Sequence, residues 1–350
     1  MTPPGAARLP VTAAAIGRAL GLAARTVVLA DLSTMGLGGP ALLVEPRRAQ
    51  DLARLLMFLR DEGLPFLPVG GASNILFPDA GLEAAVVRPA GDLALASVSG
   101  TTLLAGAGAP VAVLMDMARR AGLSGLEMAA GLPGTAGGAA MGNAGRADRG
   151  LADLLDFLEL VAPDGETVRL SRDQLAPSYR SLGLPGALGG SVVASMGLAL
   201  ARSDPGRVRE AERRFLADRA GQPRGRSLGC FFRNPPGESA GRLIDRCGLK
   251  GAADGGAEVS PGHANFILNR GAATADQVLR LAGLCRERVF LASGLWLEPE
   301  VRIVGPRGQA LDIPGLGSGP PARRDRPART ARRWDFDLAL AGPARDLDLI

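Results

Sequence analysis

Two glycine-rich segments constrain this 350-residue chain more than any other feature. The first follows an apolar run typical of a strand and consists of Val69-Gly70-Gly71-Ala72-Ser73-Asn74-Ile75-Leu76. Small residues allow successive backbone N–H groups to turn inward around a pyrophosphate, and Ser73 and Asn74 add side-chain hydrogen bonds. An ordinary tight turn is the alternative interpretation, because the G-x-G-x-x-G spacing of dinucleotide folds is absent.

The second segment consists of Gly131-Leu132-Pro133-Gly134-Thr135-Ala136-Gly137-Gly138, with Gly125-Leu126-Glu127 before it and Asn143-Ala144-Gly145 after it. Its small residues permit a flat ligand to approach the backbone closely, and Pro133 stiffens the turn. Two such loops on separate units predict one extended ligand. FAD, with a pyrophosphate at its centre and an isoalloxazine at one end, has this anatomy.

The hydrophobic pattern predicts two units around these loops. The first has strands at 41–44 and 64–69 and, between them, a helix marked by Leu52, Leu55, Leu56 and Leu59, with Gly63 as its stop. The second has a strand at 102–105, a helix at 111–121, a hairpin at Asp164-Gly165 and a strand at 191–200. Both loops therefore belong to a mixed helix and strand architecture.

A charged helix is predicted at 204–221, with Pro205 in its first turn, and leads to a third domain. That domain is expected to contain a strand at 263–269, a helix opened by the Thr274-x-x-Gln277 capping box, and a strand at 296–304. From Pro306 onward Pro, Gly and Arg dominate without periodicity, which predicts a disordered tail.

Composition narrows the functional classes. The formal net charge of +5 rests on arginine, because Lys250 is the chain's single lysine, and a basic surface suits a nucleic acid, an anionic membrane or a phosphorylated small molecule. Three cysteines without a C-x-x-C pair and one histidine, His263, predict a reducing compartment and no metal site. No apolar run has the length of a membrane span and the start lacks a basic leader, so we expect a cytoplasmic protein.

The order of motifs from Thr34 to Gly305 resembles that of the UDP-N-acetylenolpyruvoylglucosamine reductase family. Besides both glycine loops, the matching motifs are Thr34-x-x-x-Gly38-Gly39-Pro40, Tyr179-Arg180-Ser181, Gly229-Cys230-Phe231-Phe232-Arg233-Asn234-Pro235, Ala240-Gly241-Arg242-Leu243-Ile244, His263-Ala264-Asn265-Phe266 and Leu297-Glu298-Pro299-Glu300-Val301-Arg302. Each motif alone is weak, but their joint order over most of the chain is specific.

The resemblance implies an α+β fold in which a two-part FAD-binding module of the vanillyl-alcohol oxidase type precedes a C-terminal α/β substrate-binding domain. The expected divisions are a lead-in at 1–33, the FAD module at 34–203 with a split near 90, the substrate domain at 204–305 and the tail at 306–350. The implied cofactor-binding residues are Gly70, Gly71, Ala72, Ser73, Asn74, Ile75, Gly131, Pro133, Gly134, Thr135, Gly137, Gly138 and Asn143. The implied substrate-binding residues are Tyr179, Asn234 and Arg302, and the implied catalytic residues are Arg180, Cys230 and Glu300.

The implied reaction is NADPH-dependent reduction of UDP-N-acetylglucosamine enolpyruvate to UDP-N-acetylmuramate through FAD, a step of peptidoglycan synthesis that cell shape and division require. Hydride addition to the vinyl carbon leaves negative charge that a fixed guanidinium such as Arg180 stabilises. The neighbouring carbon then takes a proton from an acid, where Cys230 matches the family's donor and Glu300 its catalytic glutamate. FAD is expected to be noncovalent, because neither glycine loop contains His or Cys.

The chain also departs from the family pattern. Ala72 replaces a glycine, Arg146-Ala147-Asp148 replaces the usual Ala-Tyr-Gly, and the donor is cysteine where serine is more frequent. No tyrosine follows Tyr179, which indicates the branch of the family without the tyrosine-bearing loop. NADPH and the UDP-sugar are the expected partners of a monomer or weak dimer, with neither membrane nor nucleic acid.

Two alternative functions compete with this one. The first is a flavin oxidase of the same FAD fold. The second is a non-catalytic family member whose tail, with six arginines from Arg323 to Arg333, binds the phosphates of nucleic acid or membrane.

Overall fold

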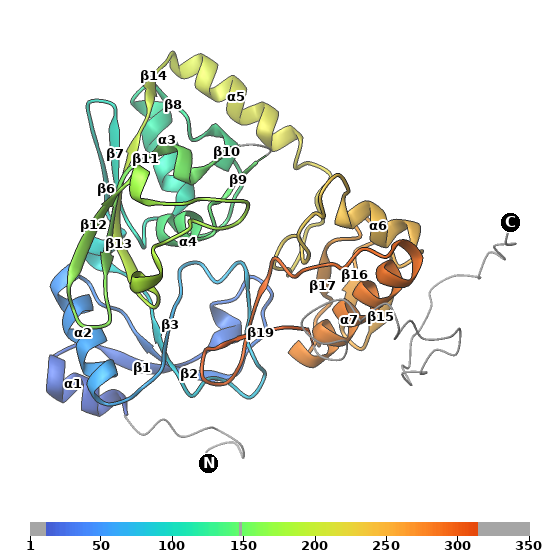
Figure 1. Cartoon of the computed structure of the whole chain (residues 1–350), viewed down its shortest axis with the longest axis horizontal. Coiled ribbons are helices and arrows are strands. Elements are labelled where there is room, and N and C mark those ends of the chain that lie inside the picture. Colours follow the sequence, from blue (N-terminus) through green and yellow to red (C-terminus); the bar gives the residue numbers. More distant parts are fainter. Residues whose placement is uncertain (1–11, 147–148, 314–350) are drawn as a thin grey trace, which may run out of the picture.

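The computed structural model describes residues 12–146 and 149–313, which form three parts lying side by side (Figure 1). The tail beyond residue 313, predicted to be disordered, and residues 147–148, predicted to depart from the family pattern, lie outside the described residues. No helix in the described ranges combines the length and the apolarity that crossing a membrane requires.

The first part is a four-stranded sheet in the order β1-β2-β5-β3, in which β2, β5 and β3 are parallel and β1 is antiparallel. Four leucines of α2 are fully buried against it, as the helical spacing predicts. The elements are α1 (Ala13–Leu20), β1 (Ala24–Val28), β2 (Pro40–Val44), α2 (Ala49–Asp61), β3 (Phe66–Pro68), β4 (Ile75–Leu76) and β5 (Ala85–Val87). Since α1 and β1 belong to this part, the separate lead-in predicted at 1–33 is corrected for its described residues.

The second part is a five-stranded antiparallel sheet in the order β12-β11-β13-β7-β6, covered by α3 and α4 through a shared apolar core. The predicted Asp164-Gly165 hairpin connects β11 to β12. The elements are β6 (Ala96–Ser99), β7 (Thr102–Gly106), α3 (Val111–Arg120), β8 (Leu123–Ser124), the 3₁₀ helix η3 (Glu127–Ala129), α4 (Ala136–Met141), β9 (Gly145–Arg146), β10 (Arg149–Gly150), β11 (Leu155–Val161), β12 (Thr167–Ser171), β13 (Val192–Ala199) and β14 (Ala201–Arg202).

Helix α5 (Pro205–Ala217) leads from the second part to the third, and its N-cap Asp204 accepts hydrogen bonds from the first-turn N–H groups (Figure 1). In the third part α7 packs on the β15-β16-β17 sheet, and the Thr274 capping box opens this helix as predicted. The elements are α6 (Ala240–Arg246), β15 (Ala253–Asp254), β16 (Ala257–Val259), β17 (Ile267–Asn269), α7 (Ala275–Ser293), β18 (Arg302–Val304) and β19 (Ala310–Leu311). Of the strand predicted at 263–269 only β17 forms, and of the strand predicted at 296–304 only β18 forms.

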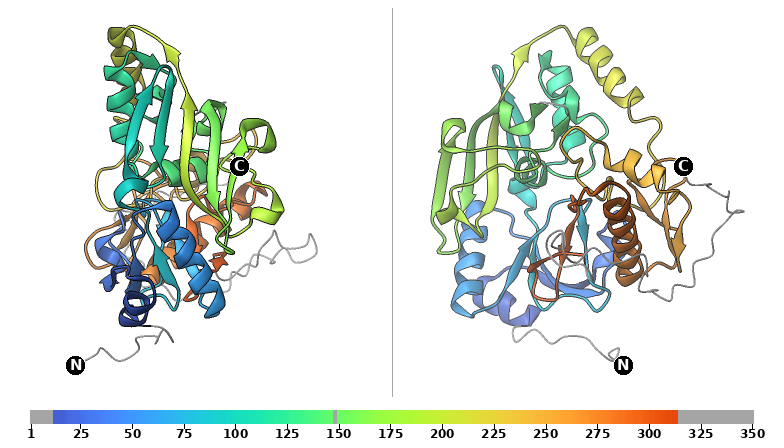
Figure 2. Two further views of the ribbon diagram at one scale, coloured as in Figure 1. Left: turned by 90° about the vertical axis from the view of Figure 1, so that its left-hand side faces the viewer. Right: turned by 45° about the vertical axis from the view of Figure 1, so that its right-hand side comes forward.

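The end of the third part returns to the first. Strand β18 pairs in parallel with β4, and β19 then pairs with β18. Figures 1 and 2 show the orange end of the third part lying against the blue first part. The core of the third part also includes Met35, Leu37 and Leu76 from the first. Residues 306–313 are therefore structured, which corrects the predicted start of the tail at Pro306.

Buried Arg286 of α7 explains why this short extension is ordered. Its guanidinium is 1% exposed, donates from Nε to the Leu297 carbonyl at 2.9 Å and lies 2.8 Å from Asp312, whose side chain is 30% exposed. Ile313 is buried beside it in the same core. A cation in this position requires its partners, because burying an unpaired charge is costly.

We predict that Asp312→Ala lowers the free energy of unfolding by about 3 kcal/mol, the lower end for removing one partner of a buried pair, because Asp312 is partly solvated. Glu210→Ala is the matched control, since it breaks the exposed Arg214–Glu210 pair of α5 and costs less than about 1 kcal/mol. Urea unfolding measures both. Equal stability of the two variants would contradict the role assigned to Asp312.

Candidate active site

The two glycine loops meet at the boundary of the first and second parts. The hydroxyl of Ser73 donates to the Pro133 carbonyl at 3.4 Å. A Cβ added at Gly71 would lie 2.6 Å from the Gly134 Cα, and one added at Gly70 would collide with the Thr135 hydroxyl. Gly71 is therefore required by the approach of the Gly134 backbone and Gly70 by the Thr135 side chain, and the loops form one surface.

This surface offers unsatisfied donors of the kind that a pyrophosphate accepts. Among the hydrogen bonds between described residues, none is donated by the backbone N–H groups from Gly70 to Asn74. The Thr135 hydroxyl is buried and has no partner among the described residues. Buried donors without acceptors are rare in proteins, so the two loops fit the pyrophosphate of FAD.

The remaining predicted cofactor residues flank this surface. Ile75 begins β4, Gly131 follows η3, and Gly137 and Gly138 lie in the first turn of α4. Residues 147–148, where we expect a departure from the family pattern, are outside the described range.

Within the described ranges, three non-glycine residues have a left-handed backbone, and all three lie at this site. They are Ala72, Asn143 and Arg180, with φ values of 47°, 38° and 58°. This conformation costs about 1–2 kcal/mol for Ala72 and Arg180, while asparagine adopts it more readily, and such residues gather where function fixes the backbone. The Asn143 side chain donates to the Ser178 carbonyl at 3.1 Å and accepts from Ala152 at 3.0 Å. Asn143, predicted as a cofactor contact, thus also contacts the segment that leads to Arg180.

Arg180 and Glu300 form the central ion pair, with Nε of the arginine 2.7 Å from Oε1 of the glutamate. The Arg180 Nη1 also donates to the Gly145 carbonyl at 3.2 Å. The Glu300 side chain is only 15% exposed, and this burial raises the pKa of its carboxyl above the ordinary value although Arg180 opposes the shift. The Tyr179 ring is half-exposed and lies 5.3 Å from the Arg180 guanidinium. Burial, followed by the Glu300 charge, raises the pKa of Tyr179.

The position of Glu300 depends on the first glycine loop. The Asn74 side chain donates to the Glu300 carbonyl at 3.0 Å, and the Asn74 carbonyl accepts the N–H of Arg302 at the same distance. A residue predicted to bind the cofactor thus also holds the backbone of a predicted catalytic residue. Arg302 contributes this backbone contact, and its side chain is exposed.

Cys230 lies beside the ion pair on a segment bridged to Phe266. The Asn265 carboxamide fixes this segment by accepting from the Phe232 N–H at 2.9 Å and donating to the Phe232 carbonyl at 2.8 Å. Burial and then the Glu300 charge raise the pKa of the Cys230 thiol to about 11, against the opposing charges of Arg180 and Arg219. The thiol is therefore protonated at neutral pH.

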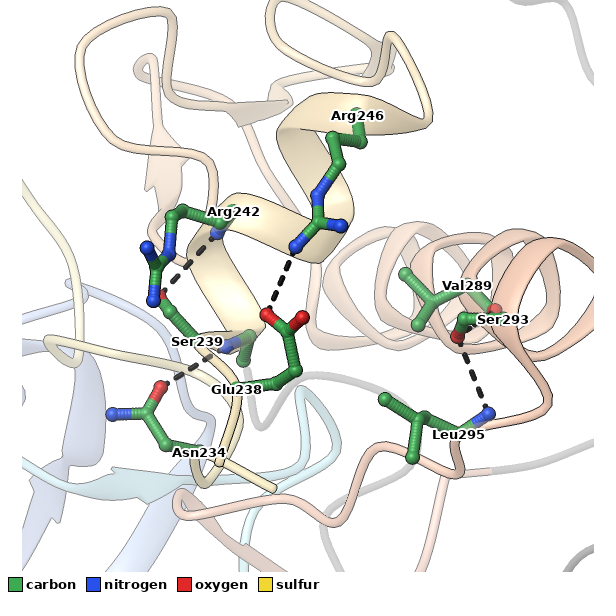
Figure 3. Close-up of polar contacts among 9 residues, drawn as sticks. Asn234, Glu238, Ser239, Arg242, Arg246, Val289, Ser293 and Leu295 are labelled. Atoms are coloured by element: carbon green, nitrogen blue, oxygen red, sulfur yellow. Dashed lines mark hydrogen bonds and ion pairs between the residues drawn. The ribbon is translucent and has the colours of Figure 1, made fainter. Parts of the chain in front are cut away.

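Asn234 stands at the entrance to α6, where its side-chain oxygen accepts the Ala240 N–H at 3.0 Å (Figure 3). The neighbouring Ser239 hydroxyl caps the same helix by accepting from Arg242, and Glu238 pairs with Arg246 (Figure 3). The predicted substrate residue Asn234 therefore uses its oxygen structurally. The backbone N–H of Asn234 hydrogen-bonds to Tyr179, and this contact lowers the pKa of Tyr179 against the effect of burial.

Sequence reasoning missed three residues at this site, namely Arg219, Arg233 and Asn265. The Arg233 Nε is buried without a hydrogen-bond partner among the described residues, and its charge opposes the rise in the pKa of Glu300. The positions of Arg233 and Asn265 inside two of the matching motifs were the available signal. His263, to which no chemistry is assigned, accepts from the Asn265 N–H at 3.3 Å and packs edge-on against Phe266.

Two family models match separate ranges of the chain. A model described as an FAD binding domain matches residues 40–171, and one described as the C-terminal domain of UDP-N-acetylenolpyruvoylglucosamine reductase matches residues 222–304. The fold and the site thus define an FAD-dependent oxidoreductase with a two-part cofactor module and an added C-terminal domain.

Whole-chain relatives specify the family. UDP-N-acetylenolpyruvoylglucosamine reductase of Anaeromyxobacter sp. (strain Fw109-5) is 41% identical over 305 residues, covering 85% of this chain and 93% of its own. The enzyme of that name from Rubrobacter xylanophilus is 41% identical over 271 residues, covering 77% and 91%. The crystal structure of the Thermus caldophilus reductase, at 36% identity, has a TM-score of 0.72 and covers 81% of this chain and 99% of its own. The chain belongs to the UDP-N-acetylenolpyruvoylglucosamine reductase family.

We predict that Ala72→Val lowers the flavin content of the purified protein and destabilises it by about 2 kcal/mol. A β-branched residue suits neither the left-handed backbone nor the buried position of Ala72. Ala72→Gly is the control and should retain flavin, because glycine adopts this conformation freely. The ratio of flavin to protein absorbance measures the effect. Full flavin content in the valine variant would show that this turn tolerates the side chain.

Proposed function

We propose that this chain reduces UDP-N-acetylglucosamine enolpyruvate to UDP-N-acetylmuramate with electrons that NADPH delivers through FAD. The observation that carries the proposal is the meeting of Arg180, Cys230 and Glu300 at the joined glycine loops. The three residues come from the second part, from the segment before α6 and from the segment before β18. The match of residues 222–304 to the reductase C-terminal domain favours this reaction over that of a flavin oxidase.

The charges at the site suit an enolpyruvyl substrate. FAD, when bound, supplies the hydride. Arg180 is held by its contacts to Glu300 and Gly145, so its guanidinium is oriented before substrate arrives and stabilises the negative charge that develops on the substrate carboxylate and enolate. Its left-handed backbone fixes the direction in which the side chain leaves the chain.

Cys230 is proposed as the proton donor to the substrate carbon. A thiol with a pKa of about 11 remains protonated at neutral pH, as a general acid must before it acts. Burial is the first reason that this proton stays on the sulfur. Glu300 adds to it, because its negative charge disfavours a thiolate and offsets that of Arg180, which favours one. The pair therefore sets the charge beside the substrate and, together with burial, the acidity of the donor.

Within the same proposal we place the enzyme in the cytoplasm, as a monomer or weak dimer acting on soluble nucleotides. The UDP-sugar and NADPH are its small-molecule partners. Tyr179 is proposed to contact the substrate, since its ring is half-exposed beside Arg180.

We predict that Cys230→Ala slows the reoxidation of reduced flavin by the enolpyruvyl substrate by about 10²–10⁴-fold, which is the usual contribution of a general acid. Reduction of the flavin by NADPH should be unchanged, because no proton from the thiol is involved. Cys230→Ser is the control and should keep substantial turnover, since an alcohol occupies this position in related enzymes. Stopped-flow spectra separate the two half-reactions, and wild-type reoxidation in the alanine variant would remove Cys230 from the mechanism.

We also predict that Glu300→Gln lowers the pKa of Cys230, whereas Arg180→Ala raises it. The first change removes the negative charge that disfavours the thiolate, and the second removes a positive charge that favours it. At one mildly alkaline pH, iodoacetamide should therefore alkylate Cys230 faster in the glutamine variant and more slowly in the alanine variant than in the wild type. Peptide mass mapping distinguishes Cys230 from Cys247 and Cys285. Both variants should lose turnover, and identical alkylation rates would show that Cys230 does not sense the pair.

A further inference from the structure

A small cavity adjoins the reacting site and carries more positive charge than the mechanism uses. Its volume is about 210 Å³, and its walls come from η3, β9, the Arg180 segment and the end of α5. Three guanidinium groups line it, those of Arg146, Arg180 and Arg219, together with one carboxylate, that of Asp218. The cavity thus has an excess of fixed positive charge.

The three arginines lie close enough to affect one another. Arg219 is half-buried, and its pKa is lowered first by burial and then by the positive charges of Arg146 and Arg180. Like charges in a partly desolvated cavity repel, so an anion that enters relieves this repulsion.

The contact that now occupies Arg146 is weak. Its Nη1 lies 2.8 Å from the Asp218 carboxylate, but the two side chains are 44% and 53% exposed. Exposed pairs of this kind contribute about 0–1 kcal/mol. A nucleotide pyrophosphate carries two negative charges where the carboxylate carries one, and a phosphate accepts two parallel hydrogen bonds from one guanidinium, so it can replace Asp218 as the partner of Arg146.

We propose that Arg146 is a phosphate-binding residue that exchanges Asp218 for the phosphate of a bound nucleotide. The inference rests on the proposed function, which supplies two nucleotides with such phosphates, the UDP-sugar and NADPH. Because Arg180 lines this cavity and also pairs with Glu300, a phosphate held here lies next to the reacting site. Arg146 belongs to the segment in which we expect this chain to depart from the family pattern, so we treat the contact as a property of this chain.

The test measures binding without turnover. Oxidised, FAD-loaded protein is titrated with UDP and, separately, with NADP⁺, and heat of binding gives the dissociation constants. Arg146→Ala should weaken binding by about 10-fold, in the range of one charge-assisted hydrogen bond. Arg146→Lys should fall between the alanine variant and the wild type. The weakening should be smaller at high salt, because screening already reduces the attraction in the wild type.

Asp218→Asn distinguishes this role from a structural one. If Arg146 exchanges partners, removing the competing carboxylate should leave binding equal or tighter. If the pair only ties β9 to α5, Asp218→Asn should weaken binding as much as Arg146→Ala does, and the proposal fails. It also fails if Arg146→Ala changes neither dissociation constant by more than about twofold, or if the wild type binds neither probe.

The two probes identify the nucleotide. Weaker binding of UDP alone would assign the cavity to the substrate, weaker binding of NADP⁺ alone to the reductant, and weaker binding of both to a shared site. Each of these results supports the role of Arg146. A protein that binds the probes through Arg146 but does not reduce the enolpyruvyl substrate would refute the proposed function and leave this inference standing.

Discussion

The parallel pairing of β18 with β4 is the contact on which the site depends. Only two residue pairs define it, Arg302 with Ile75 and Ile303 with Leu76, yet it brings the end of the third part against the first glycine loop. Asn74 then binds the backbone on both sides of Val301, with its side chain donating to the Glu300 carbonyl and its own carbonyl accepting the Arg302 N–H. Without this pairing the backbone that carries Glu300 would lose its anchor to the first glycine loop, and the proposed catalytic glutamate would not be held beside Arg180.

The site also depends on the ion pair between Arg180 and Glu300. Arg180 belongs to the second part and Glu300 to the third, so their contact joins two parts and also sets the local charge. Buried ion pairs contribute little net stability when desolvation is included, so the value of this pair is positional. In the proposed mechanism it holds Arg180 in place for substrate, and its carboxylate adds to the burial that raises the pKa of the Cys230 thiol. Stability is supplied elsewhere, by the apolar cores of the three parts.

The sequence predicted the elements whose signals are local. The leucine spacing of α2, the Thr274 capping box and the Asp164-Gly165 turn each specify structure within a few residues, and all three form as expected. The β18 to β4 pairing has no local signal, because a two-residue parallel ladder between distant segments leaves no periodicity. The apolar run before β18 was wrongly predicted as strand: Pro299 lacks an N–H for a ladder, and Leu297 gives its carbonyl to Arg286. Arg146, Asp218 and Arg219 could not be placed together, since only tertiary packing brings β9 to the end of α5.

The distance along the chain between Asn74 and Glu300 has a consequence for biosynthesis. The two residues are 226 positions apart, and ribosomes add about 5–20 residues per second, so on the order of 10–50 s separate their appearance. Both glycine loops, and the sheets that carry them, leave the ribosome well before β18 exists. The nascent protein therefore contains both glycine loops before β18 is available to pair with β4. The Asn74 contacts to Glu300 and Arg302 are among the last contacts of the site that can form.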